Sequence, residues 1–241
     1  MLESRLHYED GVYSIDQEDL EEKLADPQTS MLILCNPHNP VGKIWDRETL
    51  ERIGELCFKH HVLVLSDEIH CDITRPGMEY IPFASASEHC KNNSITCVAP
   101  TKTFNLAGLQ TAAVIVPDAA LRHRVNRGLN TDEVAEPNVF AAIAPIAAFD
   151  RGREWLEELR EYLWENRKAA EDFIREEIPE LRTVSADATY LLWIDCNALP
   201  GDLSELAEFI RKESGLYVCD GREYGNGYGF LRMNLHADGN C

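Results

Sequence analysis

Three polar segments of this chain each follow a short apolar run, and each segment carries a side chain suited to cofactor chemistry. These side chains are Asn36, Asp67 and Lys102. The apolar runs are residues 31–35, 62–65 and 95–99. Continuous apolar runs of this length are typical of parallel strands that are buried on both faces. Ligands bind at the carboxyl ends of such strands, so we expect the three segments to form one site at one edge of a sheet.

Lys102 is suited to forming a Schiff base with an aldehyde. It lies in the segment Ala-Pro-Thr-Lys-Thr-Phe-Asn-Leu-Ala-Gly, residues 99–108, which we expect to be a loop of mostly small side chains. A positioned lysine amine attacks carbonyl groups, including that of pyridoxal phosphate. We therefore predict that Lys102 carries pyridoxal phosphate. A lone lysine is more often an ordinary surface residue, and this alternative loses weight here because the other candidate residues fall at matching places.

Asp67 and Asn36 would contact the ring of such a cofactor. A carboxylate at the end of a buried strand can keep a pyridinium nitrogen protonated, which makes the ring an electron sink. Asn36 begins the sequence Asn-Pro-His-Asn-Pro-Val-Gly, whose prolines fix the backbone, and its amide could donate a hydrogen bond to a ring hydroxyl. By spacing alone, a helix cap or a solvated turn acid is the more frequent explanation for Asp67. The alternative for Asn36 is a proline-rich loop without a ligand.

Arg232 and His70 are the remaining candidates. Arg232 alternates with apolar neighbours in the run 230–235, so its side chain points to one face of a strand. An inward arginine can clamp a carboxylate with two hydrogen bonds, whereas an outward one is solvated, and the sequence supports both equally. His70 follows Asp67 by three residues and could stack on a ring or hydrogen-bond to it. A loop histidine satisfied by the protein is at least as compatible with the sequence.

Alternating strands and helices are expected to position these side chains. The first two apolar runs flank a helix expected near residues 46–61, with Asp46 as its N-cap, which predicts a βαβ unit with parallel strands. Residues 1–27 are charged and rich in turn-forming residues. Further expected helices span residues 118–129, 136–149, 154–178 and 202–214. Further expected strands span residues 111–116, 189–195, 216–219 and 230–235.

Composition disfavours several classes of function. The chain of 241 residues has 42 acidic against 23 basic side chains and a net charge of -19, which disfavours binding to nucleic acid or to anionic membranes. None of the eight cysteines forms a C-x-x-C motif, so neither a zinc site nor a thioredoxin-like site is supported. Scattered cysteines in apolar runs, without a signal peptide or an 18-residue apolar run, favour a protein of the reducing cytoplasm.

Three motifs together resemble the class I/II aminotransferases, which are pyridoxal-phosphate enzymes of fold type I. They are Asn36-Pro-His-Asn-Pro-Val-Gly42, Ser66-Asp-Glu-Ile-His-Cys-Asp72 and Ala99-Pro-Thr-Lys-Thr-Phe-Asn-Leu-Ala-Gly-Leu109. The second and third motifs are most similar to the MalY/PatB branch, which contains cystathionine β-lyases and other C–S lyases. The segments that fit the same branch are Tyr190-Leu-Leu-Trp193 and Phe230-Leu-Arg-Met-Asn234. The resemblance extends over nearly the whole chain.

The resemblance implies an α/β fold with two domains. Residues 1–150 would be the C-terminal portion of the large, cofactor-binding domain, which has a mostly parallel sheet with helices on both faces. Residues 151–241 would be a linking helix and part of a smaller α+β C-terminal domain. Because the glycine-rich phosphate loop of the family would precede Met1, we expect the chain to be a fragment that lacks the N-terminal part and the extreme C-terminus.

The resemblance also implies roles around the cofactor ring. Lys102 would hold pyridoxal phosphate as a Schiff base and act as the general base. Asp67 would pair with the pyridine nitrogen, and Asn36 would contact the ring oxygen and the substrate. His70 would take the place of a tyrosine that contacts the same oxygen in many relatives.

At the phosphate and the substrate, the resemblance assigns Thr101 to the phosphate group and Arg232 to the substrate α-carboxylate. Gln110 stands where many aminotransferases have a phosphate-binding arginine, so one charge partner is missing. The implied activity is β-elimination from cystathionine or another cysteine S-conjugate, giving a thiol, pyruvate and ammonia, in a homodimer that binds a small amino acid. Transamination is the alternative. A regulatory or binding module is less favoured because Lys102, Asp67 and Arg232 are intact.

Overall fold

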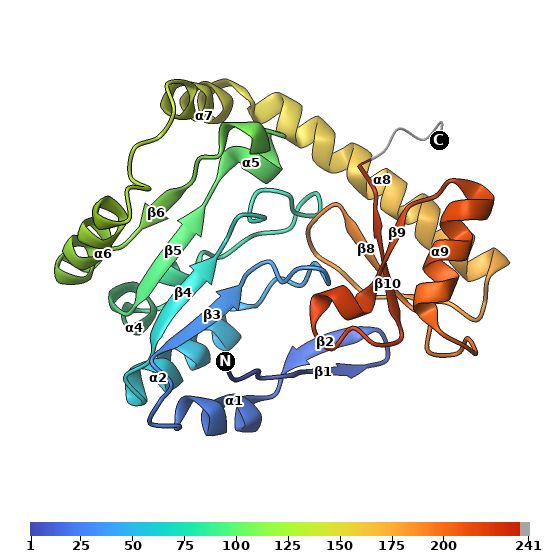
Figure 1. The fold of residues 1–241 in the computed structure, drawn as a ribbon, viewed down its shortest axis with the longest axis horizontal. Helices are drawn as coiled ribbons and strands as arrows, with labels where there is room; N and C mark the ends of the chain where they lie inside the picture. Colours follow the sequence, from blue (N-terminus) through green and yellow to red (C-terminus); the bar gives the residue numbers. More distant parts are fainter. Residues whose placement is uncertain (237–241) are drawn as a thin grey trace.

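Two four-stranded sheets form the frame of the computed structural model, which describes residues 1–236 (Figure 1). The first sheet, in spatial order, consists of β3 (Met31–Cys35), β4 (Leu63–Asp67), β5 (Ser94–Val98) and β6 (Ala113–Ile115). The second consists of β7 (Arg182–Thr183), β8 (Leu191–Asp195), β10 (Phe230–Asn234) and β9 (Val218–Asp220). In the first sheet β3, β4 and β5 are parallel, as predicted, and β6 is antiparallel to β5. The second sheet is antiparallel throughout.

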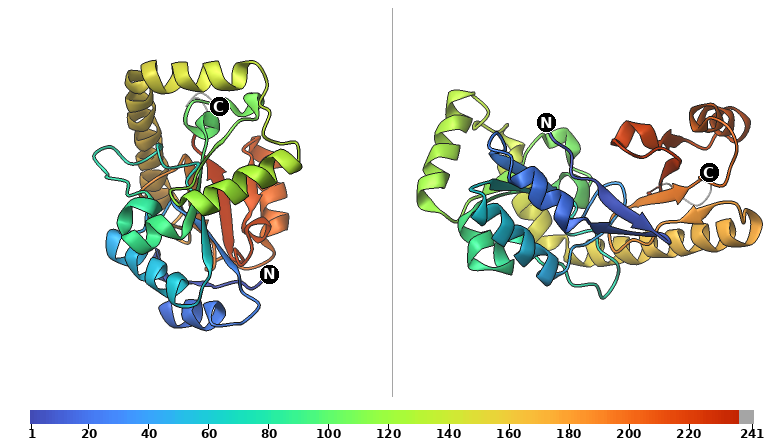
Figure 2. Two further views of the ribbon diagram at one scale, coloured as in Figure 1. Left: turned by 90° about the vertical axis from the view of Figure 1, so that its left-hand side faces the viewer. Right: turned by 90° about the horizontal axis from the view of Figure 1, so that it is seen from below.

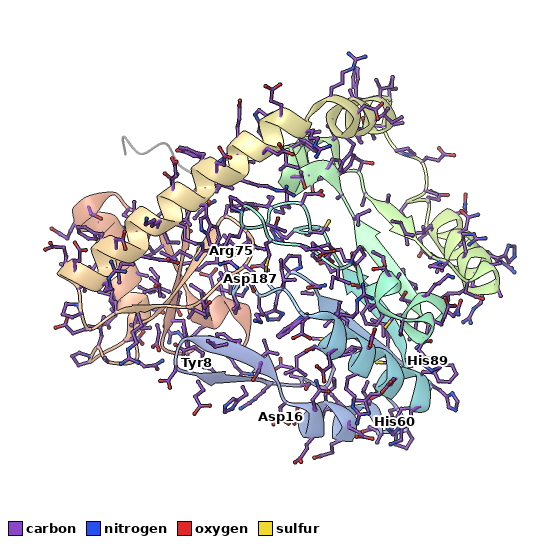
Figure 3. All side chains as sticks on the ribbon, turned by 180° about the vertical axis from the view of Figure 1, so that it is seen from behind. Tyr8, Asp16, His60, Arg75, His89 and Asp187 are labelled. Carbon is purple, nitrogen blue, oxygen red and sulfur yellow. The ribbon has the colours of Figure 1, made fainter. Side chains whose placement is uncertain are left out.

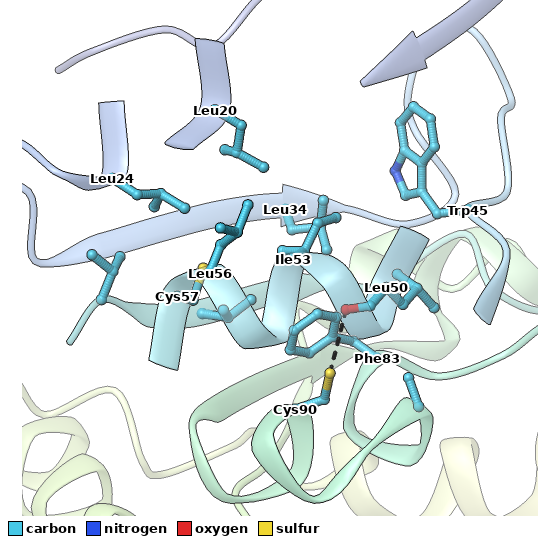
Figure 4. Packing of buried hydrophobic residues seen from close by; sticks show 13 residues of the cluster. Leu20, Leu24, Leu34, Trp45, Leu50, Ile53, Leu56, Cys57, Phe83 and Cys90 are labelled. Carbon is cyan, nitrogen blue, oxygen red and sulfur yellow. Dashed lines mark hydrogen bonds between the residues drawn. The ribbon is translucent and has the colours of Figure 1, made fainter. Parts of the chain in front are cut away.

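The first sheet carries a hydrophobic core on one face (Figure 4). The helices that pack there are α1 (Gln17–Leu24), α2 (Arg47–Lys59), α3 (Phe83–Ala86) and α4 (Glu88–Asn92). Helix α2 begins where the sequence predicts, because the Asp46 side chain accepts a hydrogen bond from Thr49 N. Side chains alternate along a strand, so Leu34 of β3 lies in this core while Ile33 is 59% exposed. The first sheet is therefore packed by these helices on the face that carries Leu34.

The N-terminal residues form more regular structure than their turn-rich sequence suggested. Strands β1 (Leu6–Glu9) and β2 (Val12–Ile15) form a hairpin, and helix α1 (Gln17–Leu24) follows. Asp10 and Gly11 make the turn with φ of 49° and 82°, the left-handed conformation that Asp-Gly hairpin turns adopt. The hairpin packs on the second sheet, where Tyr8 Oη donates a 2.7 Å hydrogen bond to Asp195 Oδ2. The strands escaped prediction because each is only four residues long.

A long helix, α8 (Arg153–Glu177), leads from the first sheet to the second along one side of the molecule (Figure 2). Its Leu163 and Ile174 are buried, whereas Phe173 is 59% exposed. The other long helices are α6 (Ala119–Thr131), α7 (Phe140–Arg151) and α9 (Leu203–Ser214). Helix α7 begins later than predicted, since the Asn138 side chain turns the chain by accepting a hydrogen bond from Phe140 N. Within residues 1–236, no helix is long and apolar enough to cross a bilayer.

The two faces of the second sheet have different surroundings. Leu192 of β8 and Leu231 of β10 belong to a core shared with α8 and α9. Trp193 and Phe230 point the other way and stack on each other, with 5.2 Å between ring centroids. Strand β8 begins later than predicted, because Thr189 has φ of 72°, which no strand residue adopts. The face that carries Trp193 packs against the N-terminal hairpin, whose Tyr8 and Tyr13 lie on this second hydrophobic cluster.

Hydrogen bonds join the segment before β8 to the loop after β3. Gly42 O accepts hydrogen bonds of 2.9 Å from the amides of Asp187 and Ala188. A Cβ atom at Gly42, which has φ of 76°, would lie 2.3 Å from Ala188 O, so only glycine fits there. Figure 3 shows Arg75 and Asp187 near each other at this junction, where the charged groups are 3.9 Å apart. These contacts tie the second sheet to the loops at the carboxyl edge of the first.

Candidate active site

The carboxyl ends of β3, β4 and β5 place three polar side chains in a row. Cys35, Asp67 and Cys97 are register neighbours across the parallel strands, so their side chains point to the same face. Asp67 is the last residue of β4, which agrees with the sequence prediction. Burial, together with the nearby Asp67 carboxylate, raises the pKa of both thiols. The carboxylate is therefore flanked by two protonated thiols.

Lys102 lies in the short helix α5 (Pro100–Thr103) rather than in the loop that the sequence suggested. The neighbours of Lys102 hold this helix in place: Thr103 is fully buried, and Phe104 packs edge-on against Phe149 with 5.3 Å between centroids. A Cβ atom at Gly152 would lie 2.6 Å from the Phe104 ring, so the glycine leaves room for that ring. The Lys102 side chain is exposed, and within residues 1–236 its amine has no hydrogen-bond or ion-pair partner.

His70 shows how the candidate residues are arranged. It is 4% exposed, and among the described residues its buried Nδ1 atom has no hydrogen-bond partner. Burial is the main cause that lowers the pKa of His70 from 6.5 to about 4; the positive charges of Lys102 and Arg232 lower it further, and Asp67 opposes them. The Tyr190 ring lies edge-on to the His70 ring at 5.7 Å. The charges of Asp67, Lys102 and Arg232 therefore all act on this neutral imidazole.

Arg232 reaches the site from the second sheet. It stands opposite Trp193 and Cys219 in the antiparallel register, so it points away from the core that contains Leu231. Its Cζ atom lies 4.1 Å from the centroid of the Tyr224 ring, and its Nη2 donates to Cys219 Sγ at 3.7 Å. Among the described side chains it forms no ion pair, so its positive charge is available to a carboxylate ligand.

Asn36 lies in the interior, where its side chain is engaged by the protein itself. Asn36 has no exposed surface. Its Oδ1 accepts a hydrogen bond from Trp45 N at 3.2 Å, and its Nδ2 donates to Ile81 O at 3.3 Å. The amide therefore holds the protein together. Asn39, three residues further in the same segment, is exposed and has no hydrogen-bond partner within residues 1–236, which makes it the amide available to a ligand.

Thr101 and Gln110 lie on either side of the Lys102 segment. Thr101 is half-buried beside Lys102 in α5, and within the described residues its hydroxyl has no hydrogen-bond partner. Gln110 is exposed in a left-handed turn with φ of 49° at the end of the 3-10 helix η1 (Ala107–Leu109). The Thr101 hydroxyl is thus free to meet a phosphate oxygen.

These residues fit the ring side of pyridoxal phosphate. The Asp67 carboxylate can face a pyridine nitrogen, and the partnerless amine of Lys102 can hold a carbonyl carbon. The orphaned Nδ1 of His70 can meet a polar substituent of the ring. In the part of the chain that the structure describes, no cluster of three His, Cys, Asp or Glu side chains could hold a metal ion.

Three residues near the site were missed by sequence reasoning. Tyr190 and Tyr224 contact His70 and Arg232 through their rings, and such contacts between distant segments leave no pattern in the sequence. Asn39 had a signal, because it repeats the Asn-Pro pair of Asn36 nearer to the glycine that makes the turn.

Comparison with known proteins identifies the family of the chain. The family described as aminotransferase class I and II matches residues 5–241. The cystathionine beta-lyase PatB of Bacillus subtilis (strain 168) is 43% identical over 235 residues, which are 97% of this chain and 61% of PatB. The family motifs of the sequence thus belong to a similarity that spans almost the whole chain.

Solved structures share the fold. A PLP-bound putative aminotransferase from Clostridium difficile 630 has a TM-score of 0.91 and 39% identity, covering 96% of this chain and 60% of that protein. A PLP-bound C-S lyase from Staphylococcus hominis has a TM-score of 0.85 and 32% identity, covering 96% of this chain and 59% of the lyase. The chain therefore spans less than two thirds of the length of these similar proteins.

Proposed function

The chain belongs to the class I and II aminotransferase family, and on this premise we propose that the protein is a pyridoxal-phosphate-dependent cystathionine β-lyase. The broader substrate class is cysteine S-conjugates, which carry sulfur on the β-carbon. The observation that carries the proposal is that Asp67 ends β4 and Lys102 follows β5, the neighbouring parallel strand, so that both lie at one edge of the sheet. The 43% identity to PatB favours a lyase over an aminotransferase.

The ring of the cofactor would be held from three sides. Lys102 would bind it covalently through Nζ, since this amine has no competing partner within residues 1–236. Asp67 would accept a hydrogen bond from the ring nitrogen, and its place at the end of β4 supports this role. Asn39, in place of the buried Asn36, would donate a hydrogen bond to the ring oxygen.

The remaining candidates would contact other groups. His70 would place its orphaned Nδ1 against a polar substituent of the ring, and Thr101 would donate its hydroxyl to the phosphate. Arg232 would clamp the substrate α-carboxylate with two hydrogen bonds, which its uncompensated charge and its position on β10 support.

Arg232 and Lys102 would carry out different parts of the reaction. When bound, pyridoxal phosphate supplies an electron sink that acidifies the α-hydrogen of an amino acid. Arg232 would orient the substrate, and Lys102 Nζ, released from the cofactor when the substrate amine takes its place, would take the α-proton as general base. The Cβ–S bond breaks with its electron pair on sulfur, which leaves as a thiol after it gains a proton. Addition of water then releases pyruvate and ammonia.

Transamination is the second candidate, because it would need the same residues, with Lys102 as the group that moves the proton. The full-length protein, loaded with pyridoxal phosphate, should be given L-cystathionine without any keto acid. We expect pyruvate, homocysteine and ammonia in equal amounts over many turnovers. A single turnover that resumes only after a keto acid is added would identify an aminotransferase instead.

A matched pair of lysine variants tests the role of Lys102. Lys102→Ala should lower the turnover by at least about 100-fold, as expected for loss of a general base, and should abolish the absorption band of the bound cofactor. Lys91→Ala is the control, because Lys91 pairs with Glu88 on the surface at 3.3 Å. Unchanged turnover and absorption in Lys102→Ala would refute the proposal.

We also propose that the whole protein is a cytoplasmic homodimer whose domains meet near residue 150. The seven described cysteines are all free, which suits a reducing compartment. Ile143 and Ile146 of α7 are 65% and 61% exposed, and a subunit interface would cover them. Helix α8 begins at Arg153, which supports a boundary just before it. Sedimentation of the full-length protein at several concentrations would test the dimer.

A further inference from the structure

We infer that Tyr224 is a positioning residue for substrate recognition: its ring holds the guanidinium of Arg232 in the orientation that clamps the substrate α-carboxylate. The inference rests on the proposed function, in which Arg232 binds that carboxylate. Tyr224 itself need not touch the substrate, the cofactor or the reacting atoms. Tyr224 acts by orienting Arg232. The glycine-rich turn, residues 221–229, acts in its turn by holding the Tyr224 ring in place.

Stacking restricts Arg232 without occupying its hydrogen-bond donors. The Cζ atom lies 4.1 Å from the centroid of the Tyr224 ring, well within the range of a cation–π interaction. A guanidinium has five N–H donors in one plane, and a ring below that plane leaves the donors at its edge free. The one donor used is Nη2, which meets Cys219 Sγ at 3.7 Å. The plane of the guanidinium is thus fixed while a carboxylate can still bind at its edge.

The partners of Arg232 are uncharged. Burial and a hydrogen bond to Cys219 raise the pKa of Tyr224 to about 12, so its hydroxyl stays neutral near neutral pH. Within residues 1–236, Arg232 forms no ion pair. A carboxylate partner within the protein would compete with the substrate for the same donors, whereas an aromatic ring does not. Tyr224 therefore orders the side chain and leaves its charge for the ligand.

The fold leaves the Tyr224 ring little freedom. Tyr224 ends the 3-10 helix η2 (Gly221–Tyr224), and its ring meets Trp193 edge-on at 6.1 Å. A Cβ atom at either Gly221 or Gly227 would lie 2.9 Å from the Trp193 ring and 2.2 Å from the carbonyl oxygen of the other glycine. The two glycines therefore let the turn close tightly on Trp193, which stands opposite Arg232 in the sheet. The turn, the tryptophan and the arginine form one packed unit.

The experiment measures recognition of the α-carboxylate in the full-length protein loaded with pyridoxal phosphate. In Tyr224→Leu we expect the KM for L-cystathionine to rise about tenfold, as expected for a partly buried cation–π pair, while kcat stays within about twofold. The preference for a cysteine S-conjugate over its carboxamide should fall by the same factor, and so should the affinity for L-alanine in calorimetry. Tyr224→Phe keeps the ring and should keep all three values.

Two controls separate positioning from a general loss of structure. Tyr217→Leu is matched, because Tyr217 also lies on an arginine, Arg211 at 5.8 Å, but is 65% exposed on the surface. It should change none of the three values. In an Arg232→Lys background, Tyr224→Leu should add little, since residues that act through one contact are not additive.

The outcomes are distinguishable. If Tyr224→Leu leaves the KM, the carboxylate preference and the affinity for L-alanine unchanged, the inference is overturned while the proposed function stands. A Tyr224→Phe variant as weak as Tyr224→Leu would also overturn it, because the ring is then not what matters. If the wild-type protein releases no pyruvate, the proposed function fails, and the calorimetric affinities for L-alanine still decide whether Tyr224 positions Arg232.

Discussion

The hydroxyl group of Thr103 donates a hydrogen bond of 3.0 Å to Asp72 Oδ2, and this bond joins the helix that carries Lys102 to the segment that follows Asp67. From the other side, Arg160 Nε of α8 donates to Asp72 O at 2.6 Å. Asp72 therefore links α5, the end of β4 and the long helix that leads to the second sheet. This link holds the helix that carries Lys102 next to the segment that follows Asp67.

Thr103→Val should loosen this link without leaving a cavity, because the two side chains have nearly the same volume. We expect the free energy of unfolding to fall by about 1–3 kcal/mol, since the half-buried Asp72 carboxylate loses its partner. The turnover of the loaded full-length protein should fall as well, because Lys102 is less well placed. Thr111→Val is the control: Thr111 is half-buried, and its hydroxyl has no partner within residues 1–236. Equal effects in both variants would contradict a role of the Thr103–Asp72 bond.

Asn36 and Asn39 should respond differently to the same change. Asn36→Ala leaves Trp45 N and Ile81 O without partners in the interior, so the free energy of unfolding should fall by at least about 2 kcal/mol. Asn39→Ala should change that free energy by less than about 0.5 kcal/mol, because the side chain is exposed. It should instead weaken binding of pyridoxal phosphate about tenfold, the loss expected for one hydrogen bond. Urea unfolding and a fluorescence titration would measure the two effects. If Asn36→Ala weakened cofactor binding and Asn39→Ala lowered the stability, Asn36 rather than Asn39 would be the residue that contacts the ring.

His70 should make the stability depend on pH. Its pKa is about 4 in the folded protein against 6.5 ordinarily, so between these values the unfolded chain binds more protons. The stabilisation is therefore present above pH 6.5 and is lost as the pH falls through 4, by about 3 kcal/mol at most. His70→Gln should flatten the unfolding free energy between pH 7 and pH 4, whereas His123→Gln, at an exposed position, should not. Parallel pH profiles in the wild type and His70→Gln would contradict this prediction.

Glu68 should make the stability depend on pH in the opposite direction to His70. It is 2% exposed, and its burial raises its pKa above the usual 4.5, although hydrogen bonds from Ser66 Oγ and Phe83 N partly offset the effect. The folded protein therefore binds this proton more tightly than the unfolded chain, so the stabilisation is present below pH 4.5 and is lost as the pH rises through the higher value. Glu68→Gln should remove that loss, and the exposed Glu79→Gln should not. Urea unfolding between pH 4 and pH 8 measures the stability of both variants. A Glu68→Gln profile as steep as that of the wild type would count against this prediction.

The sequence by itself determined the placement of the reactive groups along the sheet edge. An apolar run that ends in an acid predicts a carboxylate at the end of a buried strand, and Asp67 is the last residue of β4. Asp46 caps α2 and Lys102 follows β5, as predicted. Such signals are local, because strand burial, capping and turn formation depend on a few consecutive residues. For this reason the βαβ unit formed by β3, α2 and β4 and the position of Lys102 after β5 could be predicted from the sequence.

Only the tertiary structure decided which side chains are free to act. Asn36 and Asn39 stand in identical Asn-Pro pairs, and Asn36 is excluded because Ile81, 45 residues away, packs against its amide. Tyr224 became relevant because its turn folds onto Trp193 and brings its ring to Arg232. The physical reason is the same in both cases. Burial and ring contacts depend on where distant segments meet, and that meeting is a property of the packed fold rather than of any short stretch of sequence.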